Sequence, residues 1–181
     1  MLDILRRLWP GKPKRPFHLF QVEPTMRCNL KCTMCPWPEF RASQADMAWA
    51  TFQRLVPHLP LAQELDLTGG GESLLHPRLL DMVQSGKEAG CSVGFSTNAT
   101  LLTPEISATL VETGLDWIAY SIDGATASTY ESIRQGAHFQ AVLGHLQAMQ
   151  EAKRVRQSQT PHTMIFFVMM RRLGGTGSAM A

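Results

Sequence analysis

Three of the four cysteines in this chain lie within eight residues, in the stretch TMRCNLKCTMCP at residues 25–36. Cys28, Cys32 and Cys35 have the spacing C-x3-C-x2-C. Thiolates gathered in one loop are soft ligands, which suits an iron–sulfur cluster or zinc. A zinc site usually takes four ligands from paired motifs far apart in sequence, so a distant histidine would have to complete this one. Three cysteines without a fourth instead indicate a cubane cluster with one iron open to a substrate or cofactor.

The fourth cysteine, Cys91, stands just before the apolar run SVGFS. That run predicts a strand, and Cys91 stands at its N-terminal end, opposite the end at which a ligand would bind. Free cysteine is among the most frequently buried residue types. We therefore interpret Cys91 as a core residue.

Short apolar runs alternate with helical patterns along the chain. Strands are predicted at residues 18–24, 64–68, 92–96, 117–122 and 164–170, and helices at residues 47–59, 77–90, 103–111, 126–135 and 139–156. This alternation predicts βα units on a parallel sheet. A polar or glycine-containing segment follows each strand, and ligands of such folds bind at these carboxyl ends. The cysteines occupy the first of these positions.

The last predicted strand, MIFFVMM at residues 164–170, contains only apolar residues, so we expect it to be buried. The eleven residues that follow are rich in glycine and small residues and have no apolar period. A crossover to another parallel strand needs about a dozen residues or more. We therefore expect no sixth strand, and an outer edge of the fifth strand with unpaired N–H and C=O groups.

The composition, with 181 residues, 44% apolar and 18% charged, predicts one globular domain. We predict a basic N-terminal segment at residues 1–17 (a helix over residues 2–9, then a linker), a core at residues 18–171 and a disordered tail at residues 172–181. The basic segment is interpreted as a solvated tail, with contact to nucleic acid or an anionic membrane as the alternative.

The sequence contains no run of 18 apolar residues and no secretory signal, so neither a membrane span nor export is expected. We therefore predict a cytoplasmic location, where thiols stay reduced and clustered cysteines serve metal or redox chemistry. The net charge of +2 says little about partners.

The cysteine motif after a first strand resembles that of the radical S-adenosylmethionine (SAM) superfamily. The stretch CNLKCTMCP is similar to the branch whose members often carry a C-terminal cysteine-rich SPASM domain. TGGGESLLHP, STNAT and SIDGATASTYESIRQG carry the rest of the resemblance, which covers roughly residues 18–171. It implies an α/β fold, a partial (βα) TIM-like barrel with about five units visible. The sixth unit is expected to be missing, so the chain resembles a truncated member or one half of a split enzyme.

The resemblance also implies roles for individual residues. Cys28, Cys32 and Cys35 would hold a [4Fe-4S] cluster, and SAM would bind the fourth iron through its amino and carboxylate groups. The segment GGE at residues 70–72 matches the family element that holds the methionine amino group. The cofactor-binding residues that the resemblance implies are Gly70, Gly71, Glu72, Thr97, Asn98, Ser121 and Asp123.

Residues after the third and fourth strands would bind the ribose hydroxyls or the methionine carboxylate of SAM, and Arg134 would pair with that carboxylate. Met34 stands where many members place an aromatic residue beside the adenine, and its apolar side chain keeps that contact. Ser73 stands where proline is commoner, which changes the stiffness of the loop. Simpler interpretations remain open, because GGGES also fits a tight turn and residues 121–123 also fit a helix cap with an Asp-Gly turn.

The function implied is that of a radical SAM enzyme. The reduced cluster would cleave SAM reductively to a 5′-deoxyadenosyl radical, which abstracts hydrogen from an unknown substrate, either a peptide or a small molecule. The expected partners are a one-electron donor of the flavodoxin or ferredoxin type and a separately encoded C-terminal half. Two alternatives remain open, a non-catalytic iron–sulfur protein and a zinc-stabilised interaction module.

Overall fold

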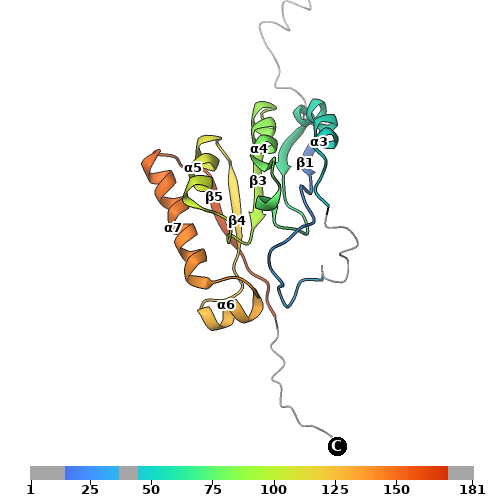
Figure 1. The fold of residues 1–181 in the computed structure, drawn as a ribbon. Coiled ribbons are helices and arrows are strands. Elements are labelled where there is room, and N and C mark those ends of the chain that lie inside the picture. The colour runs from blue at the N-terminus through green and yellow to red at the C-terminus, as the bar shows by residue number, and fades with distance from the viewer. Residues whose placement is uncertain (1–14, 37–44, 171–181) are drawn as a thin grey trace, which may run out of the picture.

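The computed structural model describes residues 15–36 and 45–170. The predicted helix at residues 2–9 and the predicted tail at residues 172–181 lie outside this part of the chain. The described strands form one parallel sheet in the order β1-β2-β3-β4-β5 (Figure 1). They are β1 (Phe17–Gln21), β2 (Ala62–Asp66), β3 (Ser92–Thr97), β4 (Trp117–Ser121) and β5 (His162–Phe166). The predicted parallel sheet of βα units is thereby confirmed.

Helices connect successive strands (Figure 1). They are α3 (Trp49–Leu55), α4 (Leu79–Glu88), α5 (Pro104–Glu112), α6 (Ala127–Ile133) and α7 (Phe139–Val155), with the 3-10 turns η1 (Val56–Leu61) and η2 (Ser73–Leu75). The start of α5 follows the predicted pattern, because the Thr103 hydroxyl accepts the Ile106 N–H at 3.3 Å and Pro104 stands in the first turn. None of the helices in the described part is long and apolar enough to cross a membrane.

The helix predicted at residues 47–59 is shorter than expected and is divided. The α-helix ends at Leu55, and the 3-10 turn η1 takes over from Val56. Pro57 and Pro60 explain the break, because proline has no N–H to continue the helical hydrogen bonds. The strand that follows begins two residues earlier than predicted, at Ala62.

The two faces of the sheet differ in character. On the face covered by α4, a Cβ atom at Gly86 would lie 2.7 Å from Val93, so this helix packs in close contact with the sheet. On the opposite face, the Trp117 indole lies over Gly94 and its Nε1–H donates to Glu64 Oε1 at 2.9 Å. The apolar core thus lies under the helices, and the other face carries polar contacts.

Cys91 lies in this core, as predicted, with 2% of its surface exposed. Its thiol donates to the Leu59 carbonyl oxygen at 3.2 Å. Burial raises the pKa of this thiol, against the opposing effect of Arg15. Cys91 is therefore a protonated packing residue.

The last strand is parallel, as predicted, but its range and burial were predicted wrongly. It covers His162–Phe166, and all of its residues are exposed, Ile165 by 62% and Phe166 by 50%. An apolar run is buried only where neighbours cover it, and among the described residues β4 is the only strand beside β5. The expected open edge is therefore present in the described part of the chain.

Candidate metal centre

A cavity of about 500 Å³ opens at the carboxyl ends of the strands, and the three clustered cysteines line it. The predicted site residues that line it are Cys28, Cys32, Cys35, Gly70, Gly71, Glu72, Thr97, Asn98, Ser121 and Arg134, together with Met34 and Ser96. The cysteine loop, the loop after β2 and the ends of β3 and β4 thus meet in one place. Parallel strands that end at one edge of a sheet produce such a meeting.

Main-chain hydrogen bonds fix the path of the cysteine loop. The Lys31 N–H donates to the Gln135 carbonyl oxygen at 3.0 Å, and the Thr33 N–H donates to the Ile133 carbonyl oxygen at 2.9 Å. The loop therefore lies against the end of α6, a segment far along the chain. No side chain takes part in these two bonds.

The glycine-rich loop after β2 lies directly against the cysteine loop. The Glu72 N–H donates to the Arg27 carbonyl oxygen at 2.7 Å. A Cβ atom at Gly71 would lie 2.5 Å from the same oxygen, and closer still to the carbonyl oxygen of Thr25. Only glycine allows so close an approach of two main chains. The glycine run therefore reflects a contact between the two loops.

Glu72 is buried, with 2% of its surface exposed. Its Oε1 atom accepts the Thr97 hydroxyl at 2.7 Å and the Leu74 N–H at 3.2 Å, and its Oε2 atom accepts the Asn98 N–H at 2.7 Å. Burial raises the pKa of Glu72, while these donors and the nearby Arg134 charge favour the ionised form. The carboxylate therefore ties the loop after β2 to the end of β3.

Two side chains reach thiols of the cavity. Arg134 Nη1 lies 3.7 Å from Cys32 Sγ, and Asn98 Nδ2 lies 4.0 Å from Cys28 Sγ. Burial raises the pKa of the Cys32 thiol, and the Arg134 charge opposes this effect. One thiol thus has a cationic donor and another a neutral amide donor.

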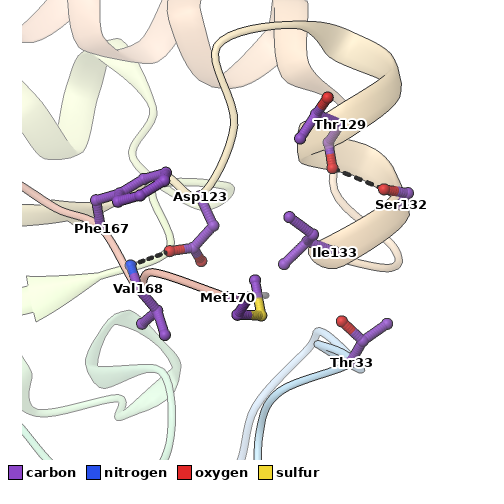
Figure 2. Close-up of a pocket in the computed structure, with 8 residues that line it drawn as sticks. All are labelled: Thr33, Asp123, Thr129, Ser132, Ile133, Phe167, Val168 and Met170. Atoms are coloured by element: carbon purple, nitrogen blue, oxygen red, sulfur yellow. Dashed lines mark hydrogen bonds between the residues drawn. The ribbon is translucent and has the colours of Figure 1, made fainter. Parts of the chain in front are cut away.

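Asp123 does not line the cysteine cavity, in contrast to the expectation that it faces the cofactor. Its side chain is fully buried, and its Oδ2 atom accepts Arg134 Nε at 2.6 Å. Its Oδ1 atom accepts the Val168 N–H at 2.8 Å, the bond drawn in Figure 2. Both oxygens therefore have protein partners, and this carboxylate supports the site through Arg134.

A second cavity, of about 400 Å³, lies on the other side of this carboxylate (Figure 2). Thr33 of the cysteine loop, Ile133 of α6 and Met170 beyond β5 are among its lining residues. Val168 lines both cavities, so the segment after β5 separates them.

The sequence did not reveal several residues that line the cysteine cavity. Thr68 and Gly69 lie within the motif TGGGESLLHP that carries the resemblance, but no role was predicted for them. Phe166 and Val168 also line the cavity, but apolar residues of a strand carry no local signal of such a role.

Side-chain hydrogen bonds outside the cavity also hold the cysteine loop and the glycine-rich loop in place. Arg27 pairs with Asp46 at 2.8 Å and donates to the Leu75 carbonyl oxygen at 2.6 Å. Ser73, which stands in place of the commoner proline, is buried and donates its hydroxyl to the Leu67 carbonyl oxygen at 2.7 Å. The serine thus stiffens the turn through a hydrogen bond.

The donor set suits an iron–sulfur cluster, because thiolates are the usual ligands of its irons. In a cubane cluster each thiolate binds a different iron, so the sulfur atoms stay apart. The three thiols share a cavity with space for a further ligand. The residues present therefore fit a cluster.

Comparisons with known proteins agree with this geometry. The model of the family described as the Radical SAM superfamily matches residues 22–172. A tungsten-containing aldehyde ferredoxin oxidoreductase cofactor-modifying protein from Pyrococcus furiosus is 33% identical over 139 residues, covering 75% of this chain and 36% of the relative. The mycofactocin maturase MftC from Mycobacterium tuberculosis is 28% identical, covering 72% of this chain and 34% of the relative. The chain thus spans little more than a third of the length of these relatives.

Solved structures share the fold. Native anSMEcpe with bound AdoMet has a TM-score of 0.63 at 18% identity, covering 84% of this chain and 44% of that chain. BtrN in complex with AdoMet and 2-DOIA has a TM-score of 0.61 at 21% identity, covering 85% of this chain and 58% of that chain. The predicted α/β fold, a partial TIM-like barrel, is thereby confirmed.

Proposed function

The chain belongs to the radical SAM superfamily, and we propose that Cys28, Cys32 and Cys35 hold a [4Fe-4S] cluster that acts on SAM. The observation that carries this proposal is the single cavity in which the three thiols meet the glycine loop and the ends of two strands. Relatives named as a maturase, a heme synthase and a cyclase support an enzymatic role. The core that does this work is proposed to cover residues 18–171.

Cys28, Cys32 and Cys35 would hold the cluster, whose chemistry would be one-electron reductive cleavage of SAM to methionine and a 5′-deoxyadenosyl radical that abstracts hydrogen from the substrate. The protein contributes position and shielding. Gly70 and Gly71 line the cavity beside the cysteines and are proposed to meet the methionine amino group of SAM. Glu72 fixes their loop to the end of β3 through its three donors.

The remaining proposed contacts come from the strand ends. Thr97, Asn98 and Ser121 line the cavity and are proposed to meet the ribose or the methionine part of SAM. Asp123 is proposed to act indirectly, because its oxygens hold Arg134 and the Val168 N–H. Met34 supplies an apolar surface in the same cavity.

The proposed partners follow from this chemistry. A one-electron donor of the flavodoxin or ferredoxin type is required to reduce the cluster. The substrate is a peptide or a small molecule, and the likeness to a mycofactocin maturase supports the SPASM-associated branch. The reduced thiols that this chemistry needs favour a cytoplasmic location.

The test is anaerobic reconstitution with iron and sulfide, followed by reduction in the presence of SAM. The wild-type protein should take up four irons and four sulfides and yield methionine and 5′-deoxyadenosine. Cys28→Ala, Cys32→Ala and Cys35→Ala should each prevent assembly, because each removes one of only three protein ligands. Cys91→Ala is the matched control and should load fully, because Cys91 lies in the core.

The outcomes separate the three candidate functions. A fully loaded cluster that leaves SAM intact would favour a non-catalytic iron–sulfur protein. Tight binding of zinc without uptake of iron and sulfide would favour a structural module. Full iron loading in the protein that lacks all three cysteines would contradict the proposed ligands.

A further inference from the structure

We propose that Arg134 raises the reduction potential of the cluster through its contact with Cys32, and that Asp123 is the positioning residue that holds Arg134 there. This inference rests on the proposed function, because it assumes that Cys32 binds a cluster. It assigns Arg134 a task that does not require SAM, in addition to the pairing with a SAM carboxylate implied by the resemblance.

The Arg134 guanidinium makes two contacts, through different nitrogen atoms. Its Nε atom donates to Asp123 Oδ2 at 2.6 Å, and its Nη1 atom lies 3.7 Å from Cys32 Sγ. The Arg134 side chain is 12% exposed and that of Asp123 is fully buried, so the pair is shielded from water. A planar guanidinium held at one edge keeps a fixed direction at the other. The donor therefore points at the sulfur before any ligand arrives.

Such a donor acts on the charge of the cluster. Reduction adds one negative charge, and a nearby cation with an N–H group stabilises the reduced form more than the oxidised form. Burial strengthens the effect, because water screens the charge less. Hydrogen bonds to the sulfurs are a recognised means by which proteins set cluster potentials.

The three cysteines are not equivalent in this respect. Asn98 reaches Cys28 Sγ with a neutral amide at 4.0 Å, a longer and weaker contact. The cationic donor reaches Cys32. Arg134 should therefore dominate over Asn98 in setting the potential.

Asp123 connects this donor to the end of β5. Its Oδ1 atom accepts the Val168 N–H at 2.8 Å, while Oδ2 holds Arg134 (Figure 2 shows the bond to Val168). A shift of the segment after β5 would move the carboxylate and, with it, the donor to the sulfur. The potential of the cluster thus depends on the segment after β5, which contributes no ligand.

The experiment is a redox titration of the reconstituted cluster, followed by electron paramagnetic resonance without SAM. Omitting SAM separates the proposed effect from any pairing of Arg134 with the SAM carboxylate. Arg134→Gln should lower the midpoint potential, so that the ratio of reduced to oxidised cluster at a fixed potential falls about tenfold, or about 59 mV for one electron. Asp123→Asn should shift it in the same direction by less, because the charge remains but its position is lost.

Two further variants make the result decisive. Arg134→Lys keeps the charge without the planar fork and should give an intermediate potential. Arg154→Gln removes one positive charge from an exposed pair on α7 and should leave the potential unchanged. If Arg134→Gln takes up no cluster, the potentials of Arg134→Lys and Asp123→Asn test the proposal instead. A wild-type potential in both of these variants would overturn it.

A purely structural role gives a different pattern. It would reduce the fraction of loaded protein in Arg134→Gln, while the loaded fraction kept the wild-type potential, and that result would also overturn the proposal. Failure of the wild-type protein itself to assemble a cluster would instead contradict the proposed function.

Discussion

The site rests on two buried carboxylates with different surroundings. Glu72, after β2, accepts hydrogen bonds from neutral donors of its own loop and of the end of β3. Asp123, after β4, accepts one bond from a cation and one from the main chain beyond β5. The first carboxylate lies where two main chains touch at Gly71, whereas the second lies beside a cavity of about 400 Å³.

The difference separates two ways of building a binding site. Around Glu72 the available space limits which substitutions are tolerated, because the two loops leave no room for an added side chain at Gly71. Around Asp123 the pairing of charges limits which substitutions are tolerated, because Arg134 is largely buried and Asp123 is its carboxylate partner. Space is available there, since the second cavity lies beside Asp123. The Glu72 side should therefore respond most to added atoms, and the Asp123 side to lost charge.

The largest effect is expected at Gly71. Gly71→Ala would place a Cβ atom 2.5 Å from the Arg27 carbonyl oxygen, so one of the two loops must move. We expect a loss of about 3 kcal/mol in the free energy of unfolding, measured by urea denaturation of the apo protein. The matched control is Gly144→Ala on α7, where a Cβ atom meets nothing within 4 Å. It should stabilise the protein by up to about 1 kcal/mol, because alanine favours a helix. Equal effects of the two variants would remove the spatial argument.

Asp123→Ala should come next. It leaves the Arg134 guanidinium without its carboxylate and the Val168 N–H without an acceptor. We expect a loss of about 2 kcal/mol in the free energy of unfolding, less than for a fully enclosed pair because Arg134 is 12% exposed and can turn toward water. The control is Glu151→Ala, which breaks the exposed pair with Arg154 and should leave the urea midpoint unchanged. A midpoint that stayed at the wild-type value in Asp123→Ala would mean that the charge is not limiting.

A smaller effect is expected from the titration of Glu72. Burial raises the pKa of Glu72 in the folded protein above the ordinary value of 4.5, which is also its value in the unfolded chain. At a pH between the unfolded and the folded pKa, the folded protein therefore holds a proton that the unfolded chain has released. Stability from this group is present below about pH 4.5 and is lost as the pH rises through the folded value. The stability of the wild type relative to Glu72→Gln should therefore be greater at about pH 5 than at about pH 8. A difference that grew with pH would show that the hydrogen bonds outweigh burial.

The smallest effect is expected at Ser132. Ser132→Thr adds one methyl group, as Gly71→Ala does, but next to the second cavity (Figure 2). We expect a change of less than about 0.5 kcal/mol in the free energy of unfolding. A loss similar to that of Gly71→Ala would mean that the Asp123 side is also limited by space.

The cysteines and the glycine loop could be found from the sequence because their information is local. The spacing of Cys28, Cys32 and Cys35 predicts a cluster, and the alternation of strands and helices predicts that the loops lie at one edge of a sheet. The role of Asp123 and the exposure of the last strand depend on residues that are distant in sequence. Asp123 is held by residues 134 and 168, and no pattern of neighbouring residues encodes that pairing.

The exposure of β5 was missed for a related reason. The seven apolar residues at 164–170 predict burial, but burial is decided by what lies beside a strand and not by the strand itself. The break in the helix predicted at residues 47–59 could have been predicted from the sequence, because Pro57 and Pro60 cannot continue the helical hydrogen bonds.

The hydrogen bonds from Lys31 and Thr33 to the end of α6 have a consequence for how the cysteine loop tolerates sequence change. Both bonds run from main chain to main chain, so neither depends on which side chain stands at residue 31 or 33. Proline is the exception, because it has no N–H to donate. The positions between the cysteines are therefore open to many residue types, whereas a shift at the end of α6 would move the loop directly.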